Sequence, residues 1–298
     1  TPRAKPMTTA DDFFARAERL LARFEQSLPP LPDADFADGI AWRWRKRNGR
    51  GWLDRITRFN PVALADLQHI EPQKDELGRN TRQFLAGLPA NNALLWGPRG
   101  TGKSSLVKAL LNEYAPQGLR LVEVERHDLI DLPDIVDVLG SRPGRYIVFC
   151  DDLSFDEHDQ TYRALKTVLD GSVLSTPDNI LIYATSNRRH LVPEKLRDNQ
   201  DARYDEDGEV HQSEAVEEKI SLSERFGLWL SFHQFNQDRY LDIVAHWLEA
   251  LGVPAFDDEV RRAALQWALL HGSRSGRAAH QFARDWAGRV ALAQGDSR

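Results

Sequence analysis

The run GPRGTGKSS, from Gly97 to Ser105, has the glycine spacing and the lysine of a loop that binds phosphate groups. Gly97, Gly100 and Gly102 allow successive backbone N–H groups to point inward around an anion at the N-terminus of a helix. Their order, with Lys103 after them, matches the P-loop pattern. We therefore expect the phosphates of a nucleotide, which we take to be ATP, to contact Gly97, Pro98, Arg99, Gly100, Thr101, Gly102, Lys103, Ser104 and Ser105.

The residues after the glycines have separate expected roles. In a P-loop the lysine reaches the β- and γ-phosphates and the next hydroxyl ligates Mg²⁺. Those residues are Lys103 and Ser104 here, with Ser105 as a second hydroxyl. A buried strand at residues 92–96 before the loop and a helix at 103–114 after it supply the context that separates a P-loop from a chance match.

Two carboxylates end a second apolar run, YIVFCDD. A P-loop requires an acid at the end of a neighbouring strand, and we expect Asp151 to hold Mg²⁺ through water. Asp152 stands where a glutamate often orients or deprotonates the attacking water, and aspartate is one methylene shorter. Asp152 could instead be a helix N-cap or a surface acid. An ATPase that hydrolyses ATP slowly is therefore also an open alternative. We expect Cys150, on the strand, to be a core residue.

A third apolar run, NILIYATSN, also ends in polar residues. An adjacent parallel strand would bring Asn187 to the γ-phosphate, where it could position the attacking water. An asparagine at a strand end is also a common turn former.

The intervening sequence predicts an α/β fold. From about Asn60, short apolar runs alternate with helical segments, which is typical of a parallel sheet with crossover helices. Besides residues 92–96, strands are expected at 120–124, 146–150 and 180–185, with a helix at about 157–169. After Phe235 the spacing becomes helical at 240–251, 260–270 and 278–292.

The ordered set GPRGTGKS, VFCDD, YATSN and SERF resembles an AAA+ ATPase. From about Trp42 to the C-terminus, the amino-acid sequence is similar to that of a bacterial family of AAA+ proteins of unknown function. This family is related to replication initiators and helicase loaders. The resemblance implies a three-layer fold with a parallel five-stranded sheet and a small C-terminal helical lid. We divide the chain into a helical extension (1–59), a nucleotide-binding domain (60–235) and a lid (236–298).

Further site residues follow from the resemblance alone. Arg225 matches the arginine finger, which in AAA+ assemblies points into the neighbouring subunit's ATP site. The alternative for Arg225 is a surface ion pair with Glu224 or a similar acid. Arg277 matches the second sensor arginine, with Arg274 as the alternative. Ile70, near Leu67, lies where this superfamily packs the adenine, but both could be core residues.

The segment AWRWRKRNGRGW, residues 41–52, interleaves basic residues with tryptophans. We interpret it as a hairpin or an extended arm. Such a composition could grip a phosphate backbone and stack bases, whereas the simpler interpretation is a turn whose tryptophans dock on the next domain. An amphipathic helix is expected before it, at residues 11–28, and a charged surface loop between residues 198 and 219.

The composition is that of an ordinary globular protein. The 298 residues carry a net charge of −6, which argues against a generally nucleic-acid-coating surface. A single cysteine excludes an internal disulfide, and the histidines show no metal-ligand spacing, so Mg²⁺ is the only metal we expect. No segment has the apolar length of a membrane span or of a signal-peptide core. We therefore expect a cytoplasmic protein with no membrane partner.

Two functions remain open at this stage. The first is a Mg²⁺-dependent ATPase that forms homo-oligomers and remodels a protein or nucleic-acid partner. The second is an ATP-gated adaptor or loader that turns over little ATP. A GTPase is disfavoured because the strand end TSNRR lacks the Asn-Lys-x-Asp pattern of guanine recognition.

Overall fold

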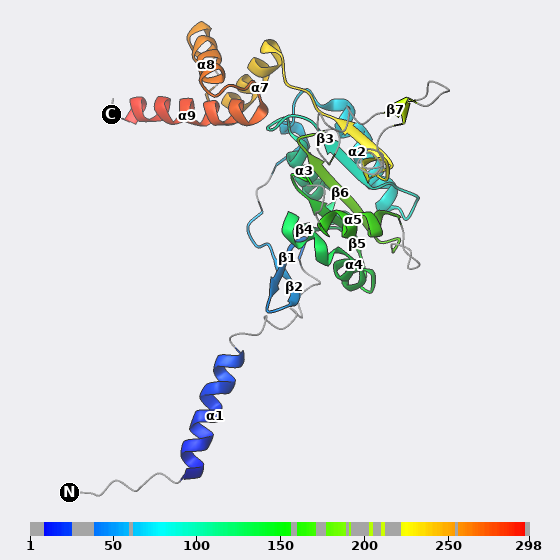
Figure 1. Ribbon diagram of the computed structural model, residues 1–298. Helices are drawn as coiled ribbons and strands as arrows, with labels where there is room; N and C mark the ends of the chain where they lie inside the picture. The colour runs from blue at the N-terminus through cyan, green and yellow to red at the C-terminus, as the bar shows by residue number, and fades with distance from the viewer. Residues whose placement is uncertain are drawn as a thin grey trace, which may run out of the picture.

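The computed structural model describes residues 9–25, 39–59, 62–155, 160–170, 177–188, 191, 203–204, 210–211, 222–253 and 256–295. These residues form a central sheet with helices on both faces, a helical lid after it and a helix before it (Figure 1). The predicted α/β class is confirmed. The loop expected between residues 198 and 219 lies outside the described residues, except for the short strands β7 (Arg203–Tyr204) and β8 (Val210–His211).

The main sheet has seven strands in the order β2-β1-β4-β5-β6-β3-β9. Every neighbouring pair is parallel except β1 and β2. All four strands predicted from the apolar runs are present. The strand bounds are β1 Ala41–Arg47, β2 Arg50–Arg55, β3 Ala93–Trp96, β4 Leu119–Val124, β5 Arg145–Cys150, β6 Ile180–Ser186 and β9 Leu228–Ser231.

The prediction of five strands was too low, because the basic and tryptophan-rich segment belongs to the sheet. Its two strands form a hairpin, and β1 pairs with β4 in parallel. Trp42 and Trp44 are 1% and 4% exposed and pack in the core on one face of the sheet. Burial of two large aromatic side chains favours this docking over an arm in solvent. The sheet therefore begins before residue 60, within the segment assigned above to the extension.

Two helical layers cover the sheet. The first consists of α2 (Glu71–Leu85) and α3 (Lys103–Tyr114), and the second of α4 (Leu132–Gly140) and α5 (Gln160–Asp170). Alternate residues of β5 enter the two cores: Phe149 faces the first layer and Cys150 the second. Burial raises the pKa of the Cys150 thiol to about 12, so this cysteine is an inert core residue, as predicted. Short 3-10 helices, η1 (Leu64–Asp66), η2 (Ala115–Gln117) and η3 (Arg126–Asp131), connect these elements.

The lid follows β9 as three helices, α7 (Gln237–Ala250), α8 (Asp258–Leu270) and α9 (Gly276–Gly295), in agreement with the helical spacing. Asn236 and Asp257 cap α7 and α8 by accepting hydrogen bonds from backbone N–H groups of the first turn. The lid lies beyond the end of the sheet where β3 meets α3 (Figure 1). It therefore faces the loop that joins these two elements.

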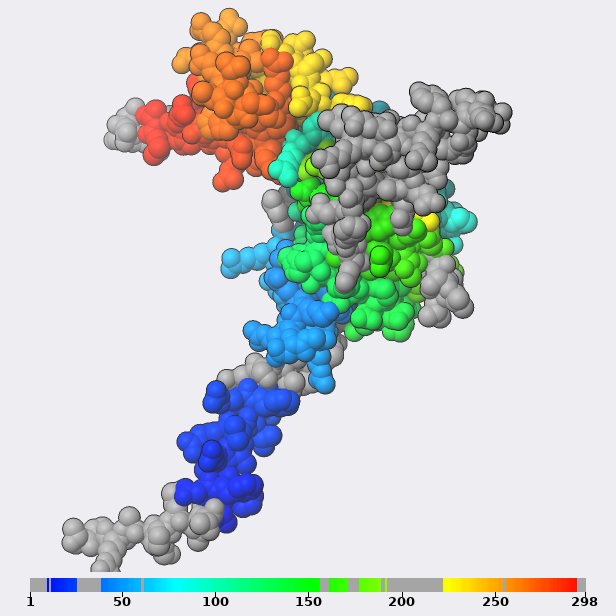
Figure 2. Space-filling model, in the orientation of Figure 1, coloured from blue at the N-terminus to red at the C-terminus, as the bar shows by residue number. Residues whose placement is uncertain are grey.

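The first helix, α1 (Thr9–Glu25), stands clear of the sheet and its helices (Figures 1 and 2). It begins near the start of the helix predicted at 11–28 and ends before the Pro29 position. Among the helices of the described residues, none combines the length and the apolarity that a bilayer crossing requires.

Candidate nucleotide-binding site

A cavity of about 620 Å³ lies between the carboxyl ends of the strands and the lid. It is lined by the loop after β3, by the ends of β5 and β6, by the segment before α2 and by the lid helices α7 and α9. The position is the one where open α/β sheets bind ligands. Predicted site residues that line it are Ile70, Arg99, Gly100, Thr101, Gly102, Lys103, Ser104, Ser105, Asp151, Asp152, Asn187 and Arg277.

The loop has the backbone that its glycines permit. Gly97, Gly100 and Gly102 have φ angles of 138°, 76° and 103°, a region that residues with a Cβ rarely adopt. Space is also limited, because a Cβ on Gly97 would collide with the carbonyl oxygen of Phe232 at the end of β9. A Cβ on Gly100 would lie 2.8 Å from the hydroxyl oxygen of Ser275 in the lid. The loop is therefore in close contact with both β9 and the lid.

Lys103 opens α3 and is 6% exposed. Its Nζ donates hydrogen bonds to the carbonyl oxygens of Gly97 (2.6 Å) and Pro98 (2.7 Å), so these two residues contact the site through the lysine. Burial lowers the pKa of Lys103, and the nearby carboxylates of Asp151 and Asp152 oppose that shift. A buried ammonium group in this position attracts a phosphate strongly, because little water screens it.

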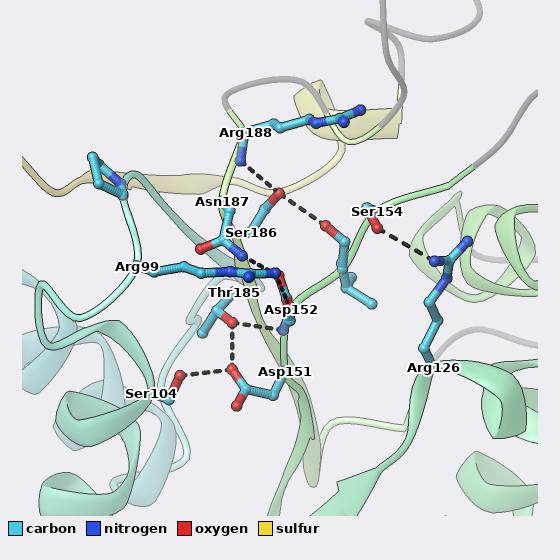
Figure 3. A network of polar contacts seen from close by, with 12 residues as sticks. Arg99, Ser104, Arg126, Asp151, Asp152, Ser154, Thr185, Ser186, Asn187 and Arg188 are labelled. Atoms are coloured by element: carbon cyan, nitrogen blue, oxygen red, sulfur yellow. Dashed lines mark hydrogen bonds and ion pairs between the residues drawn. The ribbon is translucent and has the colours of Figure 1, made fainter. Parts of the chain in front are cut away.

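Asp151 is held by two hydroxyl groups. Its Oδ1 accepts hydrogen bonds from Ser104 Oγ and Thr185 Oγ1, each at 2.6 Å (Figure 3). The Asp151 carboxylate, directly after β5, and the Ser104 hydroxyl of α3 thus lie side by side at the edge of the glycine-rich loop. One carboxylate and one hydroxyl are oxygen ligands of the kind that Mg²⁺ prefers. In nucleotide sites, phosphates and waters complete the coordination shell of the ion. Ser104 and Asp151 are the residues that would hold the ion.

Asp152 has a positive φ angle of 55°, which is uncommon for a residue with a side chain. Its backbone N–H donates to Thr185 Oγ1 at 2.9 Å. Asn187 Nδ2 donates to one carboxylate oxygen, and Arg99 Nη2 lies 3.3 Å from the other (Figure 3). Asn187 Oδ1 is also 3.4 Å from Lys103 Nζ. Asn187, directly after β6, and Arg99 of the glycine-rich loop therefore position the Asp152 carboxylate. Thr185 was given no separate role in the sequence analysis, and it contacts both Asp151 and Asp152.

The far end of the cavity is apolar and comes from segments that are distant in sequence. Ile70 lines it, with its Cδ1 3.4 Å from the position of a Cβ on Gly102. Trp247 of α7 and His280 of α9 also line it, with ring centroids 4.4 Å apart. Burial, with a smaller contribution from Arg284, lowers the pKa of His280, which favours its neutral ring. Two aromatic rings inclined at 59° to each other, beside apolar side chains, can accommodate a nucleotide base.

Sequence reasoning missed Trp247 and His280, since helical spacing marked them only as residues of lid helices. It also missed the contact between the lid and η1. His246 of α7 lies 3.2 Å from Asp66, and His69 lies 3.1 Å from Asp242 of α7. These two pairs join the lid to the segment that leads into α2.

The two arginines inferred from the family pattern lie in different places. Arg277, near the start of α9, lines the cavity, and its backbone N–H lies 3.4 Å from the Gly100 carbonyl oxygen. Arg225 is not among the described residues that line the cavity and instead forms an ion pair with Asp170 of α5. This ion pair is the alternative given above for Arg225, and the arginine-finger role stays a prediction.

Three basic residues of the hairpin, Arg43, Arg45 and Lys46, are paired with acids of the sheet region. Arg43 contacts Glu123 at 2.6 Å, and Lys46 contacts Asp131 at 2.5 Å. Trp44 Nε1 donates to the same Asp131 carboxylate at 3.2 Å. With Trp42 and Trp44 buried, these two rings cannot stack on the bases of a nucleic acid. The docking interpretation of this segment fits the structure better than the nucleic-acid one.

Two solved structures share the fold of this protein. The RuvB Holliday junction branch migration motor of Thermotoga maritima matches with a TM-score of 0.51 at 15% identity, covering 78% of this chain and 67% of that chain. The Aeropyrum pernix ORC1 protein in complex with DNA matches with a TM-score of 0.52 at 17% identity, covering 75% and 60%. At this identity the likeness shows the fold, which is that of AAA+ proteins.

Curated relatives agree with the class over shorter spans. The replication factor C large subunit of Staphylothermus marinus is 37% identical over 81 residues, which cover 27% of this chain and 18% of that protein. A rice (Oryza sativa subsp. japonica) chloroplastic ATP-dependent zinc metalloprotease, FTSH 7, is 27% identical over 186 residues, which cover 52% of this chain and 22% of that protein. The chain thus spans about a fifth of the length of these two relatives.

The family is given by a sequence profile described as "Protein of unknown function (DUF815)", which matches residues 37–290. The chain belongs to this family. The resemblance noted from the sequence, to AAA+ proteins of a family of unknown function, is therefore confirmed, and the matched residues include the hairpin, the sheet and the lid.

Proposed function

We propose that this protein binds ATP with Mg²⁺ in the cavity between the sheet and the lid, and that it hydrolyses the bound ATP. One observation carries the proposal: one cavity is lined by the glycine-rich loop, the Ser104–Asp151 pair, Asp152 and the rings of Trp247 and His280. The AAA+ fold supports the class of activity, since the relatives include proteins named as ATP-dependent.

The residues have distinct tasks in this proposal. Lys103 turns from the loop carbonyls to the β- and γ-phosphates and neutralises their charge. Ser104 and Asp151 hold Mg²⁺, which would supply charge neutralisation at the phosphates. Asp152 accepts the proton of the attacking water, and Asn187 keeps that carboxylate and the water in line. Arg277, carried by the lid, reaches the γ-phosphate side of the cavity.

We further propose that the active form is a homo-oligomer in which Arg225 serves the site of a neighbouring subunit. An arginine in that position stabilises charge on the transferring phosphoryl group, which is worth about 10³ to 10⁵ in rate in other nucleotide hydrolases. Subunit motion driven by hydrolysis would then remodel a protein or nucleic-acid partner.

A second function is favoured by the environment of Asp152. This carboxylate is already engaged by Asn187 and Arg99, and it is one methylene shorter than glutamate. An adaptor that assembles when it binds ATP and rarely hydrolyses it would need the nucleotide-binding residues but no free carboxylate to activate water. The two functions share the binding site and differ in turnover.

Phosphate release measured over a range of protein concentrations separates them. For the ATPase, activity per subunit rises with concentration, and Asp152→Ala and Arg225→Ala each lower it at least about 100-fold while ATP still binds. Mixing the two variants restores part of the activity, since each subunit can supply the part that the other lacks. If all proteins release no phosphate while ATP still promotes assembly, the adaptor is the correct function.

A further inference from the structure

Helix α1 carries an apolar stripe that faces solvent. Phe13, Phe14, Leu20 and Leu21 are 68%, 67%, 59% and 62% exposed. Phe13 and Leu20 are seven residues apart, as are Phe14 and Leu21, so each pair lies on nearly the same line along the helix. Figure 2 shows the helix standing away from the rest of the molecule. A continuous apolar stripe of this kind marks an interaction surface.

The two borders of the stripe have opposite charges. With 100° of rotation per residue, Arg16 and Arg23 lie along one border, and Glu18 and Glu25 lie along the other. Each of these pairs is again seven residues apart. All four side chains are exposed. The helix thus has one basic and one acidic flank on either side of an apolar centre.

These charges select among the surfaces that could cover the stripe. A helix that lies on a membrane has a polar face rich in lysine and arginine, which anionic lipids attract. Helix α1 has three arginines and four acids, so its net charge is negative. The same helix from a second molecule is complementary, since it offers an equal apolar stripe and both signs of charge.

The arrangement of the flanks also fixes the direction of pairing. In two parallel helices the left flank of one meets the right flank of the other, whereas in an antiparallel pair each flank meets its own copy. Parallel α1 helices therefore bring arginines against glutamates. Antiparallel helices bring like charges together, which is unfavourable.

We propose that α1 is a self-association element that packs in parallel against α1 of one or more further copies of this chain. Subunits around a rotation axis all point the same way along it, so parallel packing suits a cyclic assembly. The association requires no nucleotide. It goes beyond the proposed function, and its failure would leave the nucleotide site unaffected.

Charge reversal in the full-length chain tests the direction of pairing, by sedimentation velocity without nucleotide and at low salt. The double variant Arg16→Glu/Arg23→Glu has two acidic flanks, and Glu18→Arg/Glu25→Arg has two basic flanks. We expect each alone to dissociate at roughly tenfold higher concentration than the unchanged protein. An equal mixture of the two should associate again. Arg19→Glu, on the opposite side of the helix, is the control and should behave as the unchanged protein.

A variant of the apolar stripe tests whether the stripe itself holds the helices together. Leu20→Gln/Leu21→Gln should remove the association while circular dichroism and ATP binding stay as before. The proposal would be overturned if the unchanged protein is monomeric at tens of micromolar. It would also be overturned if the mixture of the two charge-reversed variants does not associate. Association unaffected by any of these changes would overturn it as well, as would binding of α1 to vesicles of phosphatidylserine and phosphatidylcholine without self-association.

Discussion

The buried charge of Lys103 gives the sharpest test of the nucleotide site. We consider Lys103→Met, which removes the charge and keeps most of the volume of the side chain. Two unit charges 4 Å apart attract by about 1 kcal/mol in bulk water and by about 4 kcal/mol at an effective dielectric constant near 20. Because Lys103 is 6% exposed, the larger value applies.

The lysine also has contacts to give up. To reach a phosphate, Nζ leaves the carbonyl oxygens of Gly97 and Pro98, and hydrogen bonds to a charged group are worth about 1.5 to 3 kcal/mol. The β- and γ-phosphates together attract Nζ by about 8 kcal/mol, and the two lost hydrogen bonds cost about 3 to 6 kcal/mol, so the net contribution to ATP binding is at least about 2 kcal/mol. We expect Lys103→Met to weaken binding of Mg²⁺-ATP roughly 30-fold.

Isothermal titration calorimetry at constant ionic strength measures this loss. Lys108→Met is the matched control, since it removes a lysine from the same helix α3 at a position that does not line the cavity. Its affinity should change less than about 3-fold. Thermal unfolding without nucleotide is the second readout: burial already disfavours the charged form of Lys103, so methionine should leave the unfolding temperature nearly unchanged.

Two results would refute this reasoning. If Lys103→Met binds ATP within about 3-fold of the unchanged protein, the cavity does not hold the phosphates against this residue. If both methionine variants weaken binding equally, the loss reflects overall charge rather than the site.

Three further predictions follow from other contacts. Asn187→Ala should lower the turnover number about 10-fold or more and leave ATP affinity within about 3-fold, because the amide positions Asp152; equal losses in both constants would contradict this role. His280 has a lowered pKa, so it binds fewer protons when folded than when unfolded, and its contribution to stability is lost as pH falls below about 6.5. His280→Phe should therefore lose less stability between pH 7.5 and about pH 5 than the unchanged protein in urea titrations, and an equal loss would count against it. Tyr183→Phe should cost about 1 to 3 kcal/mol of unfolding free energy, since the buried hydroxyl bonds Asn80 and Thr81; a higher unfolding midpoint would rule that out.

Sequence alone indicated the parts of the site that directly follow a strand. The phosphate loop, Asp151 and Asn187 each follow a strand, and the strands were visible as apolar runs. Parallel strands end at the same edge of a sheet, so their last residues meet there. The fold class and the lid helices followed from the same local patterns.

The hairpin was harder because its charges suggested an exposed arm. Trp42 and Trp44 alternate with Arg43 and Arg45, and an alternation of period two is also the pattern of a strand with one buried face. Asp54 of β2 pairs with Arg45 nearby in the chain, but the other acids that pair with these arginines come from β4 and the segment after it, more than 70 residues later. No local pattern can show such partners.

The end of the cavity near the lid was expected only at Ile70, from the family resemblance, and Trp247 and His280 were missed for the same reason. Ile70, Trp247 and His280 come from three separate segments, and each looks like an ordinary core residue within its own helix or loop. Only the packing of the lid against the sheet brings them together.

The close contacts of the phosphate loop have a thermodynamic consequence. Gly97 lies against Phe232, where the chain leaves β9 for the lid, and Gly100 lies against Ser275 and Arg277 at the start of α9. A nucleotide that shifts this loop must therefore shift the lid, and the coupling is reciprocal. Any partner that binds one lid position better than another changes ATP affinity by the same factor that ATP changes the affinity for that partner.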